Sequence, residues 1–332
     1  MMTFDYQYPF EDITMDLLKG IGEIVAKLAF IFPGQGAQYV GMAQDFYESY
    51  EESKQIFDEA EEILKINLAD LCFKENEQLN ITEYTQIAML TTCISILKKV
   101  ESLGIKPDVT AGLSLGEYPA LVASGVLDFV DAVKVVRERG KLMQEAVPVG
   151  VGTMAAVLGL AEDVTKKICD ETPGIVTIAN YNCPGQIVIS GEIKAVEEAS
   201  KRIKEAGAKR VLPLNVSGPF HSPMLMGAGE ELKKVLDTVN IHKPIIPYID
   251  NTNASYIYED SQIKELLVKQ VSSSVMWQQS VEKMIAEGVD TFIEIGPGKT
   301  LTSFVKKISK ECKTINIEKI TDIDKLQEVS QC

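Results

Sequence analysis

The chain has 332 residues, of which 45% are hydrophobic, and its 33 Lys and Arg against 48 Asp and Glu give a net charge of −15. This apolar content is ordinary for a globular protein and well above that of a disordered one, and the length allows two domains or one with an insert. The negative charge repels nucleic acid and anionic membranes at long range, which argues against both as partners.

Residues 1–26 come before the first convincing strand and carry apolar residues such as Ile13, Leu17 and Ile21 at helical spacing. We expect either an extra helix or a disordered N-terminal extension. Acidic residues stand where a signal peptide would be basic, and the six cysteines are scattered without a CxxC pair. These features fit a reducing compartment, so we expect a cytoplasmic protein. The most apolar stretch, 86–97, is too short to cross a bilayer.

From Lys27 onward, short β-branched or apolar runs alternate with longer helical patterns, and Gly-rich turns follow the runs at 27–32, 109–111 and 291–295. This alternation is typical of an α/β sheet with mostly parallel strands, whose carboxyl edge gathers functional sites. We therefore predict one large α/β domain and a C-terminal tail. The large domain comprises residues 27–149 and 217–320, and the tail comprises residues 321–332.

Between residues 150 and 216 the order of predicted elements changes. The strands are expected at 153–159, 175–181, 186–190 and 210–214, and the helices at 161–171 and 193–206. This β-α-β-β-α-β order is the split ferredoxin-like motif, which can stand as a small domain. We predict that residues 150–216 form a ferredoxin-like α+β subdomain inserted into the large domain.

Residues 112–116 read Gly-Leu-Ser-Leu-Gly and lie between a strand and a helical run. In a G-x-S-x-G turn the glycines remove Cβ atoms that would collide, so the serine is lifted into the open. The N-terminus of the following helix points at the same place and favours developing negative charge. Ser114 is therefore a candidate nucleophile. The alternative is an ordinary strand-to-helix turn with Ser114 near an N-cap.

A serine nucleophile needs a base, and the chain contains only two histidines, His221 and His242. His221 lies in a Gly-Pro-Phe-His-Ser-Pro segment just after the strand that closes the insert. His242 precedes a strand-like run at 245–249 and is expected in a solvated loop. We select His221, against the alternative of a structural histidine that holds a Pro-rich loop.

A helical wheel over 131–146 places Arg139 among apolar side chains and puts Arg137 on the opposite face. A buried guanidinium is costly unless it is paired, and its planar fork suits a carboxylate. Arg139 is therefore either a ligand clamp or half of a buried ion pair.

Two other kinds of site are excluded by the pattern. Gly298-Lys299-Thr300 follows a strand like the end of a phosphate-binding loop, but Ile293 stands where that loop needs a glycine. No His-Glu-x-x-His pattern, Cys/His cluster or acidic calcium loop occurs, so we expect no metal.

Several motifs in the same order resemble the malonyl-CoA:acyl carrier protein transacylases of fatty acid synthesis and the related acyltransferase domains of polyketide synthases. The similarity runs from about residue 27 to the end of the Lys-rich helix expected near residue 313. Its motifs are residues 32–38, 112–117, 139–148, 182–186, 218–222, 275–277 and 294–299. The resemblance implies an α/β-hydrolase-like large domain. It also implies ping-pong transfer of a malonyl group from malonyl-CoA to the phosphopantetheine thiol of acyl carrier protein through a malonyl-serine.

The resemblance assigns the catalytic roles. Ser114 would attack the thioester, and His221 would act as base and then as acid. The backbone carbonyl of Gln270 would orient the imidazole, and the backbone N–H groups of Gln35 and Leu115 would form the oxyanion hole.

The resemblance also assigns Arg139 to the malonyl carboxylate, which agrees with the wheel. Asn182 and Gln35 would line the same pocket, and Phe220 would crowd an added α-methyl group. The family usually has histidine before the nucleophile, where this chain has Leu113. We expect altered packing there rather than loss of activity.

The resemblance implies no cofactor beyond the substrates and a monomeric protein. The carrier is acidic, like this chain, so docking requires a local basic patch. The first candidate is Lys209 with Arg210, and the second comprises Lys306, Lys307 and Lys310 on a predicted terminal helix; the alternative for both is a solvated helix face. Two other functions are an acyltransferase that serves a polyketide synthase in trans and a hydrolase that uses the same serine.

Overall fold

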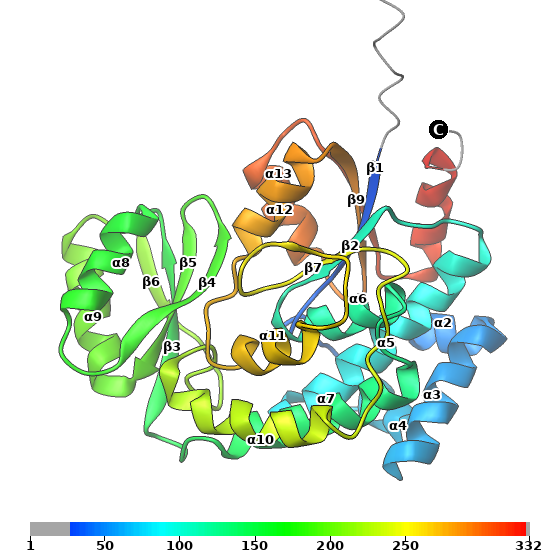
Figure 1. Cartoon of the computed structure of the whole chain (residues 1–332), viewed down its shortest axis with the longest axis horizontal. Helices are drawn as coiled ribbons and strands as arrows, with labels where there is room; N and C mark the ends of the chain where they lie inside the picture. Colours follow the sequence, from blue (N-terminus) through cyan, green and yellow to red (C-terminus); the bar gives the residue numbers. More distant parts are fainter. Residues whose placement is uncertain (1–26, 330–332) are drawn as a thin grey trace, which may run out of the picture.

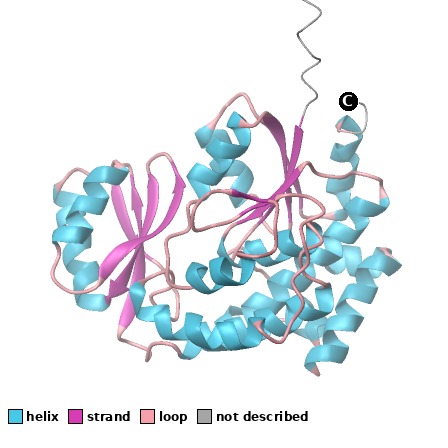
Figure 2. Ribbon diagram, in the orientation of Figure 1, coloured by secondary structure: helices cyan, strands magenta, loops and turns pink. Residues whose placement is uncertain are grey.

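The computed structural model describes residues 27–329, which form two sheets with helices packed against them (Figures 1 and 2). Sheet A has the strand order β10-β9-β1-β2-β7-β8, and all neighbours are parallel except β7 and β8. Its strands are β1 (Lys27–Phe32), β2 (Val109–Gly112), β7 (Tyr248–Ile249), β8 (Tyr256–Ile257), β9 (Val289–Ile295) and β10 (Lys313–Ile317). The predicted mostly parallel sheet is confirmed. The extension predicted at 1–26 lies outside the described residues.

Sheet A is buried on both faces, and successive side chains of a strand point to opposite faces. In β1, Phe30 and Phe32 join the larger apolar core, whereas Ala29 and Ile31 join a smaller core on the opposite face. The larger core is built with α2 (Gln44–Ser49), α3 (Glu51–Leu64), α4 (Leu68–Phe73), α5 (Thr82–Ser102), α6 (Glu117–Ala123), α7 (Phe129–Glu145), α10 (Met226–Leu236) and α11 (Ile263–Gln270). The smaller core is covered by α12 (Trp277–Ala286) and α13 (Thr300–Ile308). Short 3₁₀ helices are η1 (Gln78–Asn80), η2 (Ser114–Gly116), η3 (Pro223–Leu225) and η4 (Ile320–Glu328).

Sheet B is the smaller, antiparallel sheet, with the order β4-β5-β3-β6. It comprises β3 (Gly152–Leu158), β4 (Val176–Cys183), β5 (Gln186–Glu192) and β6 (Arg210–Pro213), and carries α8 (Glu162–Glu171) and α9 (Ile193–Glu205). All six elements predicted for residues 150–216 are present, each within about two residues of its predicted ends. Ala155 and Val157 of β3 point toward α8 and α9, so Met154 and Ala156 point away from them, toward sheet A. The second face of sheet B is thereby left to line a cavity.

The Lys-rich terminal helix is shorter than predicted. α13 ends at Ile308, Ser309 takes an extended backbone, and Lys310 lies beyond the helix. Lys313 opens strand β10 rather than ending a helix. The sequence pattern therefore overlooks the edge strand of sheet A.

The strand expected at 245–249 is reduced to the two residues of β7. Pro247 cannot donate a ladder hydrogen bond, and Ile245 is 84% exposed with its N–H bonded to the Ser124 carbonyl. Pro247 therefore confines sheet pairing to the last two residues of this segment.

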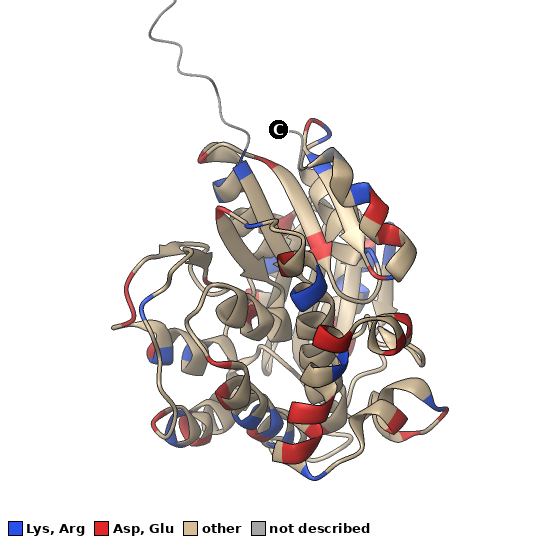
Figure 3. Cartoon of the chain, turned by 90° about the vertical axis from the view of Figure 1, so that its right-hand side faces the viewer, with Lys and Arg blue, Asp and Glu red and all other residues tan. Residues whose placement is uncertain are grey.

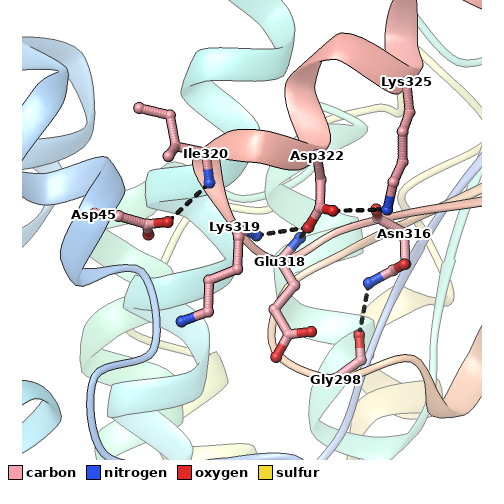
Figure 4. Close-up of polar contacts among 8 residues, drawn as sticks. All are labelled: Asp45, Gly298, Asn316, Glu318, Lys319, Ile320, Asp322 and Lys325. Atoms are coloured by element: carbon pink, nitrogen blue, oxygen red, sulfur yellow. Dashed lines mark hydrogen bonds and ion pairs between the residues drawn. The ribbon is translucent and has the colours of Figure 1, made fainter.

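The end of the described chain is tied to the rest of the protein by polar contacts (Figure 4). The Ile320 N–H donates to Asp45 Oδ2 in the first turn of α2 at 2.8 Å, and Asn316 Nδ2 donates to the Gly298 carbonyl at 3.3 Å. Asp322 accepts backbone N–H bonds at the start of η4. Residues 320–328, which overlap the predicted tail, are thus helical and are tied to α2 through Asp45, whereas Asn316 of β10 holds the turn that precedes α13.

In the part of the chain that the structure describes, no helix is long and apolar enough to span a membrane. The apolar stretch 86–97 lies within α5 and is buried throughout. The five described cysteines are free thiols, and four of them are buried. They therefore act as core residues rather than as cross-links.

Candidate active site

A cavity of about 270 Å³ opens between the carboxyl edge of sheet A and the free face of sheet B. Of the ten residues assigned to the site from sequence, seven line the cavity, and an eighth, Gln270, lies behind them against His221. The seven are Gln35, Ser114, Leu115, Arg139, Asn182, Phe220 and His221. Lys209 and Arg210 are exposed and lie outside it. The fold therefore gathers residues that are up to 235 positions apart in the sequence, from Gln35 to Gln270.

Ser114 occupies the predicted turn and has a strained backbone, with φ of 55°. The turn needs both glycines, because a Cβ on Gly112 would lie 1.8 Å from the Gly116 carbonyl oxygen and one on Gly116 would lie 2.1 Å from that of Phe32. Asn251 braces the turn by accepting the Ser114 N–H at 2.6 Å and donating to the Gly112 carbonyl at 2.7 Å. The serine is thus held outward, as a nucleophile requires.

His221 lies against Ser114, with 2.7 Å between Nε2 and the serine Oγ. Its other ring nitrogen, Nδ1, lies 2.9 Å from the Gln270 backbone carbonyl. A carbonyl oxygen can only accept, so Nδ1 carries the proton and Nε2 is free to accept one from the serine hydroxyl. His242, by contrast, is half-exposed and lies 3.6 Å from Asp128. Of the two histidines, His221 is therefore the one placed as a base.

The imidazole of His221 is kept neutral. Burial and, to a smaller extent, the nearby Arg139 charge lower its pKa to about 4, against the raising effect of the hydrogen bond that Nδ1 donates to the Gln270 carbonyl. At neutral pH the ring is therefore in the form that accepts a proton.

Arg139 is 1% exposed and points into the cavity from α7, as the helical wheel predicts. Its Nη1 donates to Gln86 Oε1 at 2.7 Å and its Nη2 to Gln270 Oε1 at 2.8 Å. Nη2 also lies 3.4 Å from Ser114 Oγ, a long contact, and Nε has no partner among the described residues. Since its acceptors are neutral, Arg139 presents an unneutralised positive charge beside the nucleophile.

Arg137 is the matched contrast on the same helix. It faces away from the cavity, pairs with Glu83 at 3.4 Å and lies over the Tyr84 ring. The two arginines thus occupy opposite faces of α7, as predicted, and only Arg139 reaches Ser114.

The Gln270 side chain joins the parts of the site. Its Nε2 donates to the Ser114 carbonyl at 2.9 Å and to Glu117 Oε2 at 2.7 Å, while its Oε1 accepts from Arg139. Its backbone carbonyl holds His221. One fully buried residue therefore touches the nucleophile, the base, the arginine and a buried carboxyl group.

The two backbone N–H groups named for the oxyanion hole come from turns that pack together. Leu115 lies in η2, just before α6, and Gln35 lies in the turn after β1. A Cβ on Gly34 would lie 2.4 Å from the Leu113 carbonyl oxygen, so the two turns are in close contact. Leu113 itself packs its side chain against the smaller core. Both turns line the cavity.

Asn182 and Phe220 both line the cavity. Asn182 of β4 is 7% exposed, and its Oδ1 has no partner among residues 27–329. Phe220 precedes His221 and is buried, with its ring near Gly218. Asn182 thus offers an unused acceptor to a ligand, and Phe220 restricts the width of the cavity.

The two predicted basic patches flank the same end of sheet B. Leu158 pairs with Gln186 on one side and with Arg210 on the other, so the side chains of Gln186 and Arg210 project from the same face. Gln186 lines the cavity and accepts a hydrogen bond from Lys307 at 3.1 Å. Arg210 and Lys307 therefore lie on either side of one cavity-lining residue.

Three buried polar residues of the site are absent from the sequence interpretation: Gln86, Glu117 and Asn251. Gln86 lies on α5, inside a run that is buried on all sides, and nothing in the pattern separates it from its neighbours. Asn251 carried a usable signal, because it follows a strand of sheet A in an Asp-Asn-Thr-Asn segment. Within the described residues, no group of three or more His, Cys, Asp and Glu could hold a metal ion.

Comparison with known proteins gives a consistent picture. Residues 29–328 match the family model described as "Acyl transferase domain". The chain is 51% identical to a malonyl CoA-acyl carrier protein transacylase of Bacillus subtilis over 88% of this chain and 94% of that protein. The structure superposes on a transacylase of the same name from Clostridium perfringens with a TM-score of 0.89 and 47% identity, covering 92% of this chain and 98% of that one.

A third relative is a malonyl-transacylase solved in complex with the acyl carrier protein of a type II polyketide synthase. It has a TM-score of 0.89 and 38% identity, and the match covers 92% of this chain and 100% of that one.

Proposed function

This chain belongs to the acyl transferase family, among the malonyl-CoA:acyl carrier protein transacylases, and from that premise we propose how its residues transfer the malonyl group. The enzyme moves a malonyl group from malonyl-CoA to the phosphopantetheine thiol of acyl carrier protein. The observation that carries the residue assignment is the line from Ser114 Oγ through His221 to the Gln270 carbonyl, with Arg139 beside the hydroxyl.

In the first half-reaction, Ser114 Oγ attacks the thioester carbon while its proton passes to His221 Nε2. The tetrahedral intermediate collapses, the carbon–sulfur bond breaks, and the CoA sulfur leaves with that proton. In the second half-reaction, the phosphopantetheine thiol gives its proton to His221 and attacks the malonyl-serine. The serine oxygen then takes the proton back. Both halves balance without any other reactant, so we propose that no cofactor takes part.

The oxyanion that forms in each half-reaction would accept from the backbone N–H groups of Leu115 and Gln35. Their turns lie in close contact with each other, so the donors are placed before the charge develops. A third contribution comes from the N-terminus of α6, which begins three residues after Ser114.

The malonyl carboxylate would bind Arg139. The long contact from Nη2 to Ser114 Oγ marks a donor that a carboxylate can take over close to the nucleophile. An acetyl group would leave this buried charge without a counter-ion, which disfavours acetyl-CoA. Phe220 would limit the room beside the α-carbon, and Asn182 would help to orient the substrate.

Release of CoA with and without acceptor tests transfer against hydrolysis. We expect malonyl-CoA to release about one equivalent of CoA per enzyme, followed by continuous release only when holo acyl carrier protein is added. Continuous release without carrier, at the rate seen with it, would identify a hydrolase and contradict the proposal.

We propose that the carrier is that of fatty acid synthesis. The alternative is the carrier of a polyketide synthase, since a relative 38% identical to this chain was solved in complex with such a carrier. The two carriers are distinguished by measuring kcat/KM with each holo form. We expect the higher value with the carrier of fatty acid synthesis, and a higher value with the polyketide carrier would contradict the proposal. We also propose a cytoplasmic monomer.

Docking of the carrier is proposed to use the cations beside Gln186. Because the net charge of the chain is −15, an acidic carrier needs a local group of cations. On the side drawn in Figure 3, which faces away from sheet B, acidic and basic residues are intermixed along the helices. Lys209 and Arg210 are exposed on sheet B, and Lys307 is exposed on α13 across Gln186.

Replacing Lys209 and Arg210 together with alanine is expected to raise the KM for holo carrier about tenfold, with the acylation half-reaction by malonyl-CoA unchanged. The matched variant replaces Lys306 and Lys307 and tests the second patch in the same assay. An equal loss in both half-reactions would show that the mutated residues do not form the carrier surface.

A further inference from the structure

The side-chain amide of Gln270 lies between a buried cation and a buried carboxyl group. Its oxygen accepts from Arg139 Nη2 at 2.8 Å, and its nitrogen donates to Glu117 Oε2 at 2.7 Å. The guanidinium has no acceptor, so the amide oxygen must face Arg139 and the NH₂ group must face Glu117. The amide dipole is thereby fixed along the line between the two groups.

The carboxyl group of Glu117 is connected to Arg139 through a single side chain, the amide of Gln270. Among residues 27–329, no carboxylate forms a hydrogen bond or an ion pair with Arg139 directly. If Glu117 is ionised, its charge acts on Arg139 across one amide, and all three side chains are buried. If Glu117 is protonated, the positive charge of Arg139 is left for a ligand.

The surroundings of Glu117 favour its neutral form. It is 1% exposed at the start of α6. Asp250, which follows β7, acts on it with a like charge, and Arg139 from α7 opposes that effect. The other titratable side chains that face it are Tyr118 on its own helix and Tyr248 of β7, both buried.

We propose that Glu117 is a positioning residue held as a neutral carboxylic acid, so that Arg139 keeps its full charge for the malonyl carboxylate, and that ionisation of Glu117 weakens malonyl-CoA binding through the Gln270 amide. This inference rests on the proposed role of Arg139. It adds a group that sets the charge of the clamp without touching the substrate.

The direction in which the pKa of Glu117 is shifted agrees with this geometry. Burial, then Asp250, raise the pKa of Glu117 to about 8, against smaller lowering effects that include Gln270 and Arg139. The pKa of His221 is about 4 and that of Tyr118 about 12, so neither titrates between pH 6 and 9. In that range Glu117 is the group beside Arg139 that changes charge. A raised pKa in an acid means that the neutral form is lost as the pH rises through it.

The first test is the pH dependence of the acylation half-reaction. In the native chain, the KM for malonyl-CoA should rise about tenfold from pH 7 to pH 9, because one unit above the pKa only about a tenth of Glu117 is neutral. In Glu117→Gln, whose side chain cannot ionise, the ratio of the two KM values should be close to one. A tenfold rise that persists in Glu117→Gln would overturn the proposal.

Glu294→Gln is the matched control. Glu294 is a second buried glutamate, whose carboxylate accepts the N–H groups of Leu301 and Thr302 at the start of α13 and whose pKa burial raises to about 7. It has no contact with Arg139 or Gln270. This variant should keep the alkaline rise in KM, and its loss here as well would show that the effect does not belong to Glu117.

The second test does not depend on the folding of a Glu117 variant. Ser114→Ala, which keeps Glu117 and cannot be acylated, is titrated calorimetrically with malonyl-CoA at pH 8.5 in buffers of different ionisation enthalpy. We expect uptake of more than about half a proton per malonyl-CoA at pH 8.5 and close to none at pH 6. Acetyl-CoA, which lacks the carboxylate, should cause none at either pH.

Absence of proton uptake at pH 8.5 would contradict the role of Glu117. The proposed function fails differently, because its failure would appear as no malonyl-enzyme at any pH in the native chain. A malonyl-enzyme that forms with an unchanged KM from pH 7 to pH 9 would leave the transferase in place and remove only this inference.

Discussion

Arg139→Ala is expected to lower kcat/KM for malonyl-CoA by roughly 10²- to 10⁴-fold, because it removes two charge-assisted hydrogen bonds worth about 1.5–3 kcal/mol each. The value for acetyl-CoA should fall much less, since acetyl makes no such bonds and no longer leaves a buried charge unpaired. The ratio of acetyl to malonyl transfer therefore rises. It is measured from the initial rates of acylation with each thioester.

Arg137→Ala provides the control for this change. Arg137 lies on the same helix but pairs with Glu83 and faces away from the cavity. Its removal should leave the selectivity for malonyl-CoA as it is in the native chain. If Arg139→Ala kept the native ratio of malonyl to acetyl transfer, the assignment of the clamp would be wrong.

His221→Ala should slow the formation of malonyl-enzyme by roughly 10²- to 10⁴-fold, which is the usual contribution of a positioned general base. The serine hydroxyl would lose the acceptor that lies 2.7 Å away. The rate is measured by rapid mixing with malonyl-CoA and quenching, followed by detection of the acylated protein.

The chain offers one other histidine for comparison. His242→Ala removes a half-exposed ring near Asp128 and should acylate at the native rate. Equal rates in the two variants would contradict the assignment of the base. Circular dichroism of both variants verifies that the fold is retained.

Much of the fold can be predicted from the sequence because the signals are local. The alternation of Phe30 and Phe32 with Ala29 and Ile31 defines β1 to both of its ends. In the segment 150–216, strand and helix patterns are separated by clear turns, and every element is found. The edge strand β10 is overlooked because Lys313 and its neighbours follow a Lys-rich helix and have no turn signal as strong as Gly or Pro before them.

Some residues of the site can likewise be predicted from local sequence signals, and others cannot. Three residues stand out in the sequence. Ser114 lies in a turn between two glycines, His221 is one of only two histidines, and Arg139 is a cation on an apolar helix face. Glu117 and Gln86 do not stand out, since a glutamate at the start of a helix and a glutamine in a long helix are common. Their importance comes from partners in α7 and α11, which the chain reaches only by folding.

The most direct test of the central claim is the intact mass of the protein after mixing with malonyl-CoA, measured beside Ser114→Ala and again after addition of holo acyl carrier protein. A malonyl adduct should form on the native chain, be absent from Ser114→Ala, and move to the carrier. An adduct of the same size on Ser114→Ala, or one that does not move to any holo carrier, would contradict transfer through a malonyl-serine at this site.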